Sequence, residues 1–175
     1  MKKILLVYWP EQGNVENVAK KFLNQFSNEQ LDLFSVADVK PETLASYDYW
    51  IVGGSTSGSH VWKDADDSFR WWDFFKMLDG IDFSNKKIAL FGLGDQILYP
   101  HHFVDGLSIM KEEFEKRNAR IYGKWPINGY KFSDSEGFEG EYFFGLALDE
   151  DQQKELTETR ITNWVSQLKK EFELE

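Results

Sequence analysis

The first two dozen residues contain the feature that most restricts the fold. Residues 4–7 form an unbroken apolar run, ILLV, which is typical of a strand buried on both faces of a parallel sheet. A loop containing a proline and a glycine follows at residues 10–13, and from Asn14 onward apolar residues recur on one helical stripe. Asn14 is expected to cap this helix. The sequence therefore predicts a strand, a tight loop and a helix in direct succession.

The loop of this unit is a candidate anion site. Backbone N–H groups and the positive end of the helix dipole converge at the start of a helix, where they favour a phosphate. The loop has neither the GxGxxG pattern nor the lysine of a Walker loop. An ordinary strand-to-helix turn therefore remains the alternative to a phosphate site.

Strands and helices alternate along the rest of the chain. Further strands are predicted at residues 31–36, 49–52, 87–91, 120–123 and 143–148. Helical periodicity covers residues 69–77, 103–117 and 152–172, and residues 41–46 are expected to form a turn or a short helix. This alternation predicts an α/β fold with a doubly wound five-stranded parallel sheet, in a single domain over residues 1–175.

The carboxyl ends of parallel strands share one edge of the sheet, and ligands bind outside that edge. Three loops are expected there, at residues 9–14, 55–62 and 93–99. The first offers backbone N–H groups, and the other two place small residues beside the large rings of Trp62 and Tyr99. A flat, phosphorylated heterocycle such as a flavin or a nucleotide suits this combination of groups.

Composition excludes several classes of protein. There are 30 acidic against 20 basic residues, a formal charge of −10, which argues against nucleic acid and anionic membranes and favours partners with basic surfaces. The chain has no cysteine, so disulfides, thiolate nucleophiles, iron–sulfur clusters and zinc–thiolate sites are excluded. No secretory segment or membrane span fits the sequence, which leads us to expect a cytoplasmic protein.

Several segments resemble the flavodoxin family. Residues 91–105, FGLGDQILYPHHFVD, resemble the third flavin loop of flavodoxins. Residues 125–130, WPINGY, and 145–151, GLALDED, resemble the two ends of the insertion that marks the long-chain subgroup. Residues 13–16 resemble the phosphate loop, and residues 156–172 resemble the final helix. The resemblance extends over essentially the whole chain.

The resemblance implies a low-potential electron carrier rather than an enzyme, with non-covalent FMN, no catalytic residues and no metal. It also implies an insertion in the last strand. The expected partners are redox proteins with basic docking surfaces, such as a flavodoxin reductase or other oxidoreductases, and the expected state is a monomer.

The resemblance also implies the residues of the flavin site. The phosphate would lie against Trp9, Pro10, Glu11, Gln12, Gly13, Asn14 and Val15. The ribityl chain and inner ring face would lie along Ser55, Thr56, Ser57 and Gly58, with Asp151 reaching the ribityl hydroxyls. The third loop begins at Leu93, and its residues Gly94, Asp95 and Gln96 would contact the pyrimidine side. Tyr99 would stack on the isoalloxazine ring.

Two departures from the family pattern bear on this site. The serine or threonine hydroxyls of the phosphate loop are replaced at Trp9, Gln12 and Val15, and a hydrogen bond to a charged group is worth about 1.5–3 kcal/mol. We therefore expect a rebuilt phosphate site, at which riboflavin binds only modestly worse than FMN. Ser57 stands where the family commonly has an inner stacking tryptophan, so Trp62 is a candidate for that ring, with surface packing as the alternative.

Two further expectations concern the second loop and the acidic residues. In flavodoxins a peptide of this loop changes orientation when the flavin is reduced, and the resemblance implies that Gly58, which allows both backbone states, has this role here. The remaining carboxylates near the site are expected to form a solvated negative rim: Asp64, Asp66, Asp67, Asp149, Glu150 and Asp151.

Three alternative functions remain open from the sequence. One is a flavodoxin-like NAD(P)H or quinone reductase that uses FMN. The others are a flavin-free module resembling a response regulator and a protein of this fold that has lost its flavin.

Overall fold

The computed structural model describes residues 2–55 and 70–174. A parallel sheet forms its centre, with strands in the order β2-β1-β3-β4-β5 and with β9 also paired to β4. The strands are β1 (Ile4–Trp9), β2 (Leu31–Ser35), β3 (Tyr49–Ser55), β4 (Lys87–Leu93), β5 (Arg120–Tyr122) and β9 (Leu146–Leu148). The predicted doubly wound α/β sheet is confirmed.

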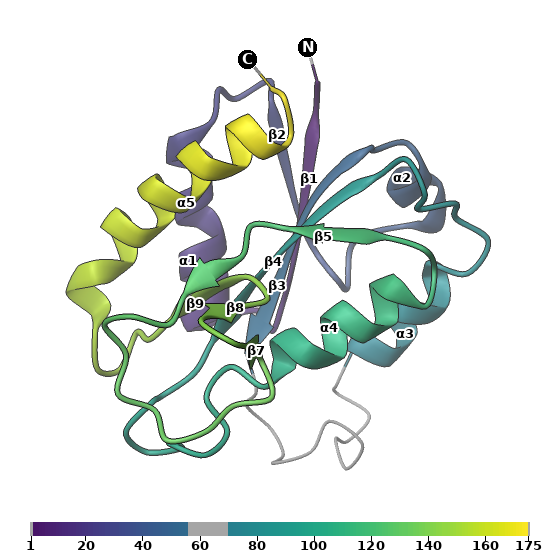
Figure 1. The fold of residues 1–175 in the computed structure, drawn as a ribbon. Helices are drawn as coiled ribbons and strands as arrows, with labels where there is room; N and C mark the ends of the chain where they lie inside the picture. The colour runs from purple at the N-terminus through teal and green to yellow at the C-terminus, as the bar shows by residue number, and fades with distance from the viewer. Residues whose placement is uncertain (1, 56–69, 175) are drawn as a thin grey trace.

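Helices cover both faces of the sheet (Figure 1). Helices α1 (Asn14–Phe22) and α5 (Thr157–Glu171) pack on one face. Helices α2 (Pro41–Ala45), α3 (Trp71–Met77) and α4 (Gly106–Glu115) contribute to the core on the other face. Successive residues of β1 alternate between the two cores, because side chains in a strand point to opposite faces. This explains the unbroken apolar run at the start of the sequence.

The fifth position of the sheet is shared by two segments. The first half of β4 pairs with β5, from Lys87 to Ala89, and the second half pairs with β9, from Phe91 to Leu93. The intervening residues carry a small antiparallel sheet of β6 (Trp125–Pro126), β8 (Tyr142–Phe143) and β7 (Phe138–Glu139). The predicted insertion in the last strand is therefore confirmed, and residues 123–145 are called the insertion below.

One predicted helix cap and two predicted helix starts were wrong. Gly13, not Asn14, is the N-cap of α1, and no side chain caps that end. Helix α4 begins at Gly106 rather than at residue 103, because Val104 has a φ of 51°, in the left-handed region that interrupts a helix. Helix α5 begins at Thr157 rather than at residue 152, after a short 3-10 turn, η3 (Lys154–Leu156). A second such turn, η1 (Leu23–Gln25), follows α1.

No helix in residues 2–55 and 70–174 is long and apolar enough to cross a membrane.

Candidate functional site

The ends of β1, β3 and β4 lie side by side at the carboxyl edge of the sheet. The strand register places Trp9 opposite Gly54, and Ser55 opposite Leu93. The first and third predicted loops, together with Ser55, therefore meet at this edge. Four predicted site residues lie outside the described part of the chain: Thr56, Ser57, Gly58 and Trp62.

The loop after β1 is hydrogen-bonded to the first turn of α1, the helix that follows it. The Gln12 backbone has a φ of 58°, and its N–H donates to the Glu16 carboxylate at 2.7 Å. Lys20 also donates to Glu16, and these two hydrogen bonds hold the pKa of Glu16 below its usual value, the bond from Lys20 having the larger effect. The Gln12 N–H, which could otherwise donate to a bound anion, therefore donates to the Glu16 carboxylate.

The other residues of this loop differ in exposure. Gln12, Gly13 and Asn14 are exposed, whereas the Val15 side chain is buried in the core. Burial raises the pKa of the nearby Tyr8, and the carboxylates of Glu16, Glu11 and Asp38 raise it further. The surroundings of this loop are therefore electronegative.

The loop after β4 has a fixed backbone. The Gly94 N–H donates to the Leu148 carbonyl, and a Cβ at Gly94 would lie 2.9 Å from the Phe103 ring, so a larger residue would displace that ring. The Asp95 carboxylate accepts from the N–H groups of Ile97 and Leu98 at 2.9 and 2.8 Å. Desolvation acts to raise the pKa of Asp95, but these bonds and one from Gln152 outweigh it and keep the pKa low.

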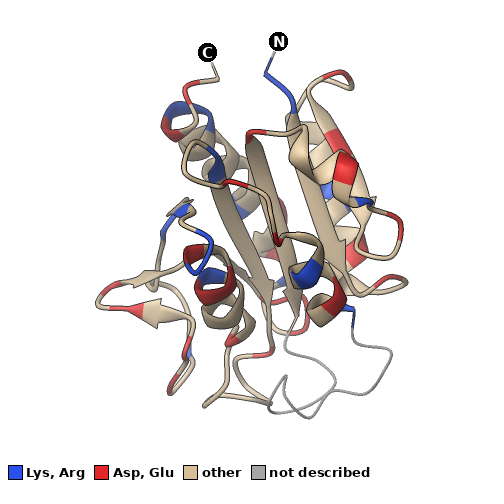
Figure 2. Ribbon diagram, turned by 90° about the vertical axis from the view of Figure 1, so that its right-hand side faces the viewer, with Lys and Arg blue, Asp and Glu red and all other residues tan. Residues whose placement is uncertain are grey.

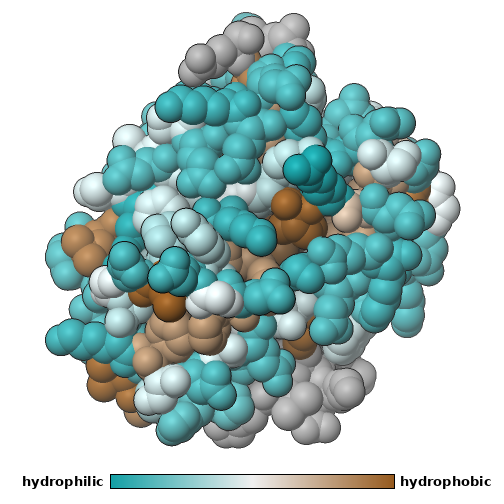
Figure 3. Space-filling model, in the orientation of Figure 1, coloured by the Kyte–Doolittle hydropathy of each residue, from teal (hydrophilic) through white to brown (hydrophobic). Residues whose placement is uncertain are grey.

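The outer part of this loop is apolar and exposed. Ile97 is 55% exposed, Leu98 67% and Tyr99 48%. Apolar surface is visible at the lower left of Figure 3, on the side where Figure 1 draws the loop that follows β4. The loop thus presents an aromatic ring and two aliphatic side chains at the predicted flavin edge.

Gln96 and Asp149 form a buried pair beneath this loop. Gln96 is 1% exposed and Asp149 is 0% exposed. One carboxylate oxygen of Asp149 accepts from the Gln96 backbone N–H at 3.0 Å and from the Gln96 side-chain amide at 2.8 Å. The backbone N–H and the side-chain amide of Gln96 therefore both donate within the protein.

The prediction that Asp149 and Glu150 lie on a solvated rim was wrong. Asp149 is enclosed by N–H donors, and Glu150 is buried with its carboxylate accepting from the Thr157 hydroxyl. Asp151 is exposed, as expected, and desolvation raises its pKa, with further contributions from Asp95 and Asp149. The sequence signal for the buried role of Asp149 is its position directly after a buried strand.

The chain has 30 acidic and 20 basic residues, and Figure 2 shows that both kinds are spread over the helices and loops around the sheet. His102 lies next to Asp105, with 2.9 Å between Nδ1 and Oδ2. Within the described ranges, no cluster of three His, Cys, Asp or Glu side chains is arranged as a metal site.

Known proteins resemble this chain over its full length. The family model described as flavodoxin matches residues 6–164. The flavodoxin of Nostoc sp. (strain PCC 7120) is 39% identical over 173 residues, which cover 99% of each chain. Flavodoxin 1 of Escherichia coli (strain K12) is 38% identical, over 97% of this chain and 94% of that one.

Solved structures agree with this result. A Fusobacterium nucleatum flavodoxin bound to flavin mononucleotide superimposes with a TM-score of 0.85 at 26% identity, covering 98% of this chain and 99% of that one. The match to the family model, the identity to full-length relatives and the shared sheet topology lead to one conclusion: this chain belongs to the flavodoxin family.

Proposed function

We propose that this chain holds one FMN at the carboxyl edge of its sheet and passes electrons between partner proteins. Membership of the flavodoxin family makes it an FMN electron-transfer protein rather than an enzyme. FMN supplies the redox chemistry, and the residues of the chain bind it, orient it and exclude water from it. The observation that carries the proposal is the loop after β4, which presents Tyr99 beside a rigid backbone at this edge.

The ring end of the site fits an isoalloxazine. Tyr99 is half exposed and can offer a ring face, with a stacking contribution of about 0.5–1.5 kcal/mol beyond area burial. Leu93, Gly94 and Asp95 would lie along the pyrimidine side, where the two backbone hydrogen bonds to the Asp95 carboxylate hold the loop in place. Asp151, exposed close to Asp95, would reach the ribityl chain.

The phosphate end fits less well than the ring end. The hydroxyls of the family pattern are absent, and the Gln12 N–H donates to Glu16. The first-turn N–H groups of α1, the Gln12 amide and the Trp9 indole would hold the phosphate against the nearby carboxylates. We therefore retain the prediction that riboflavin binds only modestly worse than FMN.

The surface around the site suggests the chemistry of the partners. Asp95 and Asp151 place negative charge beside the exposed side chains of Ile97 and Leu98. A redox protein with a basic docking surface and an apolar centre would complement this arrangement, and attraction between the charges would speed association. The monomeric state, the cytoplasmic location and the single domain remain predictions.

Visible spectroscopy of the purified protein tests the proposal. Protein supplied with FMN should be yellow and retain one flavin per chain after gel filtration. Reduction of the bound flavin by NAD(P)H should require an added reductase. Rapid bleaching by NAD(P)H alone would favour the reductase alternative, and a colourless protein after incubation with excess FMN would overturn the proposal.

A further inference from the structure

Asp149 connects two segments of the predicted flavin site from beneath. Its first carboxylate oxygen accepts from the backbone and side chain of Gln96. Its second oxygen accepts from the N–H groups of Asp151 and Gln152 at 3.1 and 2.9 Å. Since Asp149 is 0% exposed, these four bonds replace solvent around a buried carboxylate.

Gln96 extends this connection to the insertion. Its side-chain amide nitrogen donates to Asp149, and its amide oxygen accepts from the Lys131 N–H. The orientation of the amide is fixed, because turning it over would place donors against donors at Lys131 and leave its oxygen facing the Asp149 carboxylate.

The insertion is bound to the same loop at further points. The Ser133 and Asp134 N–H groups donate to the Pro100 carbonyl at 2.7 and 2.9 Å. The Ser135 hydroxyl donates to the Phe103 carbonyl, and the Phe103 and Phe132 rings stack with centroids 5.6 Å apart. The loop after β4 is thus held from below by Asp149 and from the side by the insertion.

We propose that Asp149 and Gln96 are positioning residues for the flavin ring. Together they fix residues 94–96 relative to residues 151–152, so that the pyrimidine side meets a preformed backbone instead of one that must be ordered on binding. This inference rests on the proposed FMN function and assigns ring affinity to two side chains that point away from the surface.

The substitution Asp149→Asn tests the role of the carboxylate at constant size. Each oxygen of Asp149 accepts two N–H groups, so an amide must direct its own N–H groups at one pair of donors. The matched control is Asp82→Asn, because Asp82 is an exposed residue that accepts from the Ser84 N–H just before β4, at the opposite end of that strand.

The experiment titrates the apoproteins with FMN and with riboflavin. Asp149→Asn should weaken both flavins by at least about tenfold and by the same factor, since the change acts on the ring and not on the phosphate. Asp82→Asn should bind both flavins as the unchanged protein does. Circular dichroism at the assay temperature checks whether each variant is folded, and Gln96→Met replaces Asp149→Asn if the latter is unfolded.

A double variant distinguishes the loss of loop positioning from a general loss of structure. In the double variant Asp149→Asn with Gln96→Glu, the new side-chain amide donates to the new carboxylate, which still accepts from the Lys131 N–H. The backbone N–H of residue 96 still loses its acceptor, so the recovery is partial. The double variant should bind flavin more tightly than either single variant, whereas Gln96→Glu alone puts two carboxylates in contact.

The outcomes are distinguishable. If the unchanged protein binds FMN and Asp149→Asn stays within threefold of it, or if the loss is confined to FMN, the inference is overturned and the proposed function stands. If the unchanged protein takes up no flavin, the proposed function itself fails.

Discussion

At the scale of single residues, Glu16 is the group that most affects how the chain can hold a phosphate. Its carboxylate accepts from the Gln12 N–H, and its pKa is lowered by its bonds to Lys20 and Gln12, so it remains ionised at neutral pH. A dianionic phosphate in this loop would meet a negative charge together with the N–H donors. The neutral hydroxyl at the end of riboflavin would not experience that repulsion.

The substitution Glu16→Gln should therefore tighten FMN by about three- to tenfold and leave riboflavin nearly unchanged, because it removes a negative charge that repels the phosphate and not the neutral end of riboflavin. Gln retains an oxygen that can accept from the Gln12 N–H. Titration with both flavins measures the effect, with Glu158→Gln as a control at an exposed carboxylate that pairs with Lys21. An equal change for both flavins would show that Glu16 acts on the loop and not on the phosphate.

Some residues of the site could be predicted from the sequence, and others could not. Gly94 and Asp95 were predicted on a loop at the carboxyl edge, because the apolar run before them identifies a strand and the glycine ends it. The burial of Asp149 was not predicted, since it depends on donors from Gln96, 53 residues away in the chain. A charged residue in a polar segment is expected to be solvated unless those long-range donors are known.

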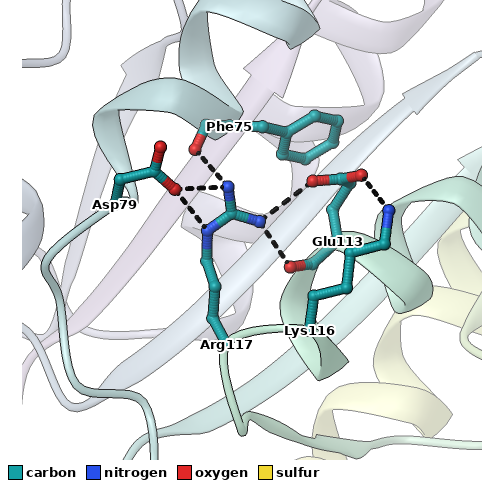
Figure 4. Close-up of polar contacts among 5 residues, drawn as sticks. All are labelled: Phe75, Asp79, Glu113, Lys116 and Arg117. Atoms are coloured by element: carbon teal, nitrogen blue, oxygen red, sulfur yellow. Dashed lines mark hydrogen bonds and ion pairs between the residues drawn. The ribbon is translucent and has the colours of Figure 1, made fainter.

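At the scale of elements, Arg117 joins the ends of two helices (Figure 4). Its guanidinium donates to the Phe75 carbonyl at 2.9 Å and twice to Asp79, near the end of α3. It also donates to the carbonyl and carboxylate of Glu113 in α4, at 2.7 and 2.9 Å. Lys116 pairs with the same Glu113 carboxylate, so the ends of α3 and α4 are linked through one planar group.

Replacing Arg117 by Lys should lower the free energy of unfolding of the apoprotein by about 1–2 kcal/mol, because a lysine has three donors on one nitrogen and cannot reach both helices. Urea denaturation followed by circular dichroism measures the change. Asp73→Asn, which removes the ion pair between the half-exposed side chains of Asp73 and Arg70, should cost less than about 0.5 kcal/mol. Equal losses in the two variants would mean that the Arg117 link contributes no more than a surface ion pair.

The elements themselves differ in how well the sequence predicts them. The strands β1, β3 and β4 were predicted because long apolar runs persist where both faces are covered. The start of α4 was missed because a left-handed valine, Val104, is seldom expected from sequence. The strands of the insertion are two residues long, and their pairing depends on contacts between distant segments, so no local period indicates them.

At the scale of the whole molecule, tyrosines with raised pKa values couple the stability of the fold to pH, and the pKa is raised most for Tyr47 and Tyr130. Burial raises the pKa of Tyr47 to about 12, and its hydrogen bond to Asp32 contributes, at 2.6 Å from the hydroxyl to the carboxylate. Burial also raises the pKa of Tyr130 well above its usual value; this hydroxyl lies between the Trp125 indole and the Ala147 carbonyl. Tyr47 connects β2 to the segment before β3, and Tyr130 connects the insertion to β9.

These raised pKa values predict a loss of stability in alkali. An unfolded tyrosine ionises near pH 10, whereas the folded Tyr47 keeps its proton to about pH 12, so the unfolded state releases protons first. The stabilisation from Tyr47 is therefore fully present below pH 10 and is lost as the pH rises from 10 to 12. After a discount for its partial exposure, this contribution is about 1–2 kcal/mol.

The substitution Tyr47→Phe isolates that contribution, because it removes the ionising hydroxyl while keeping the ring. Urea denaturation between pH 8 and pH 12 should show a shallower fall in the free energy of unfolding for Tyr47→Phe than for the unchanged protein, with the difference appearing only above pH 10. Tyr142→Phe, at a half-exposed tyrosine of the insertion, should follow the unchanged protein. Parallel curves for Tyr47→Phe and the unchanged protein would mean that the alkaline loss arises elsewhere, with Tyr130 as the next group to replace.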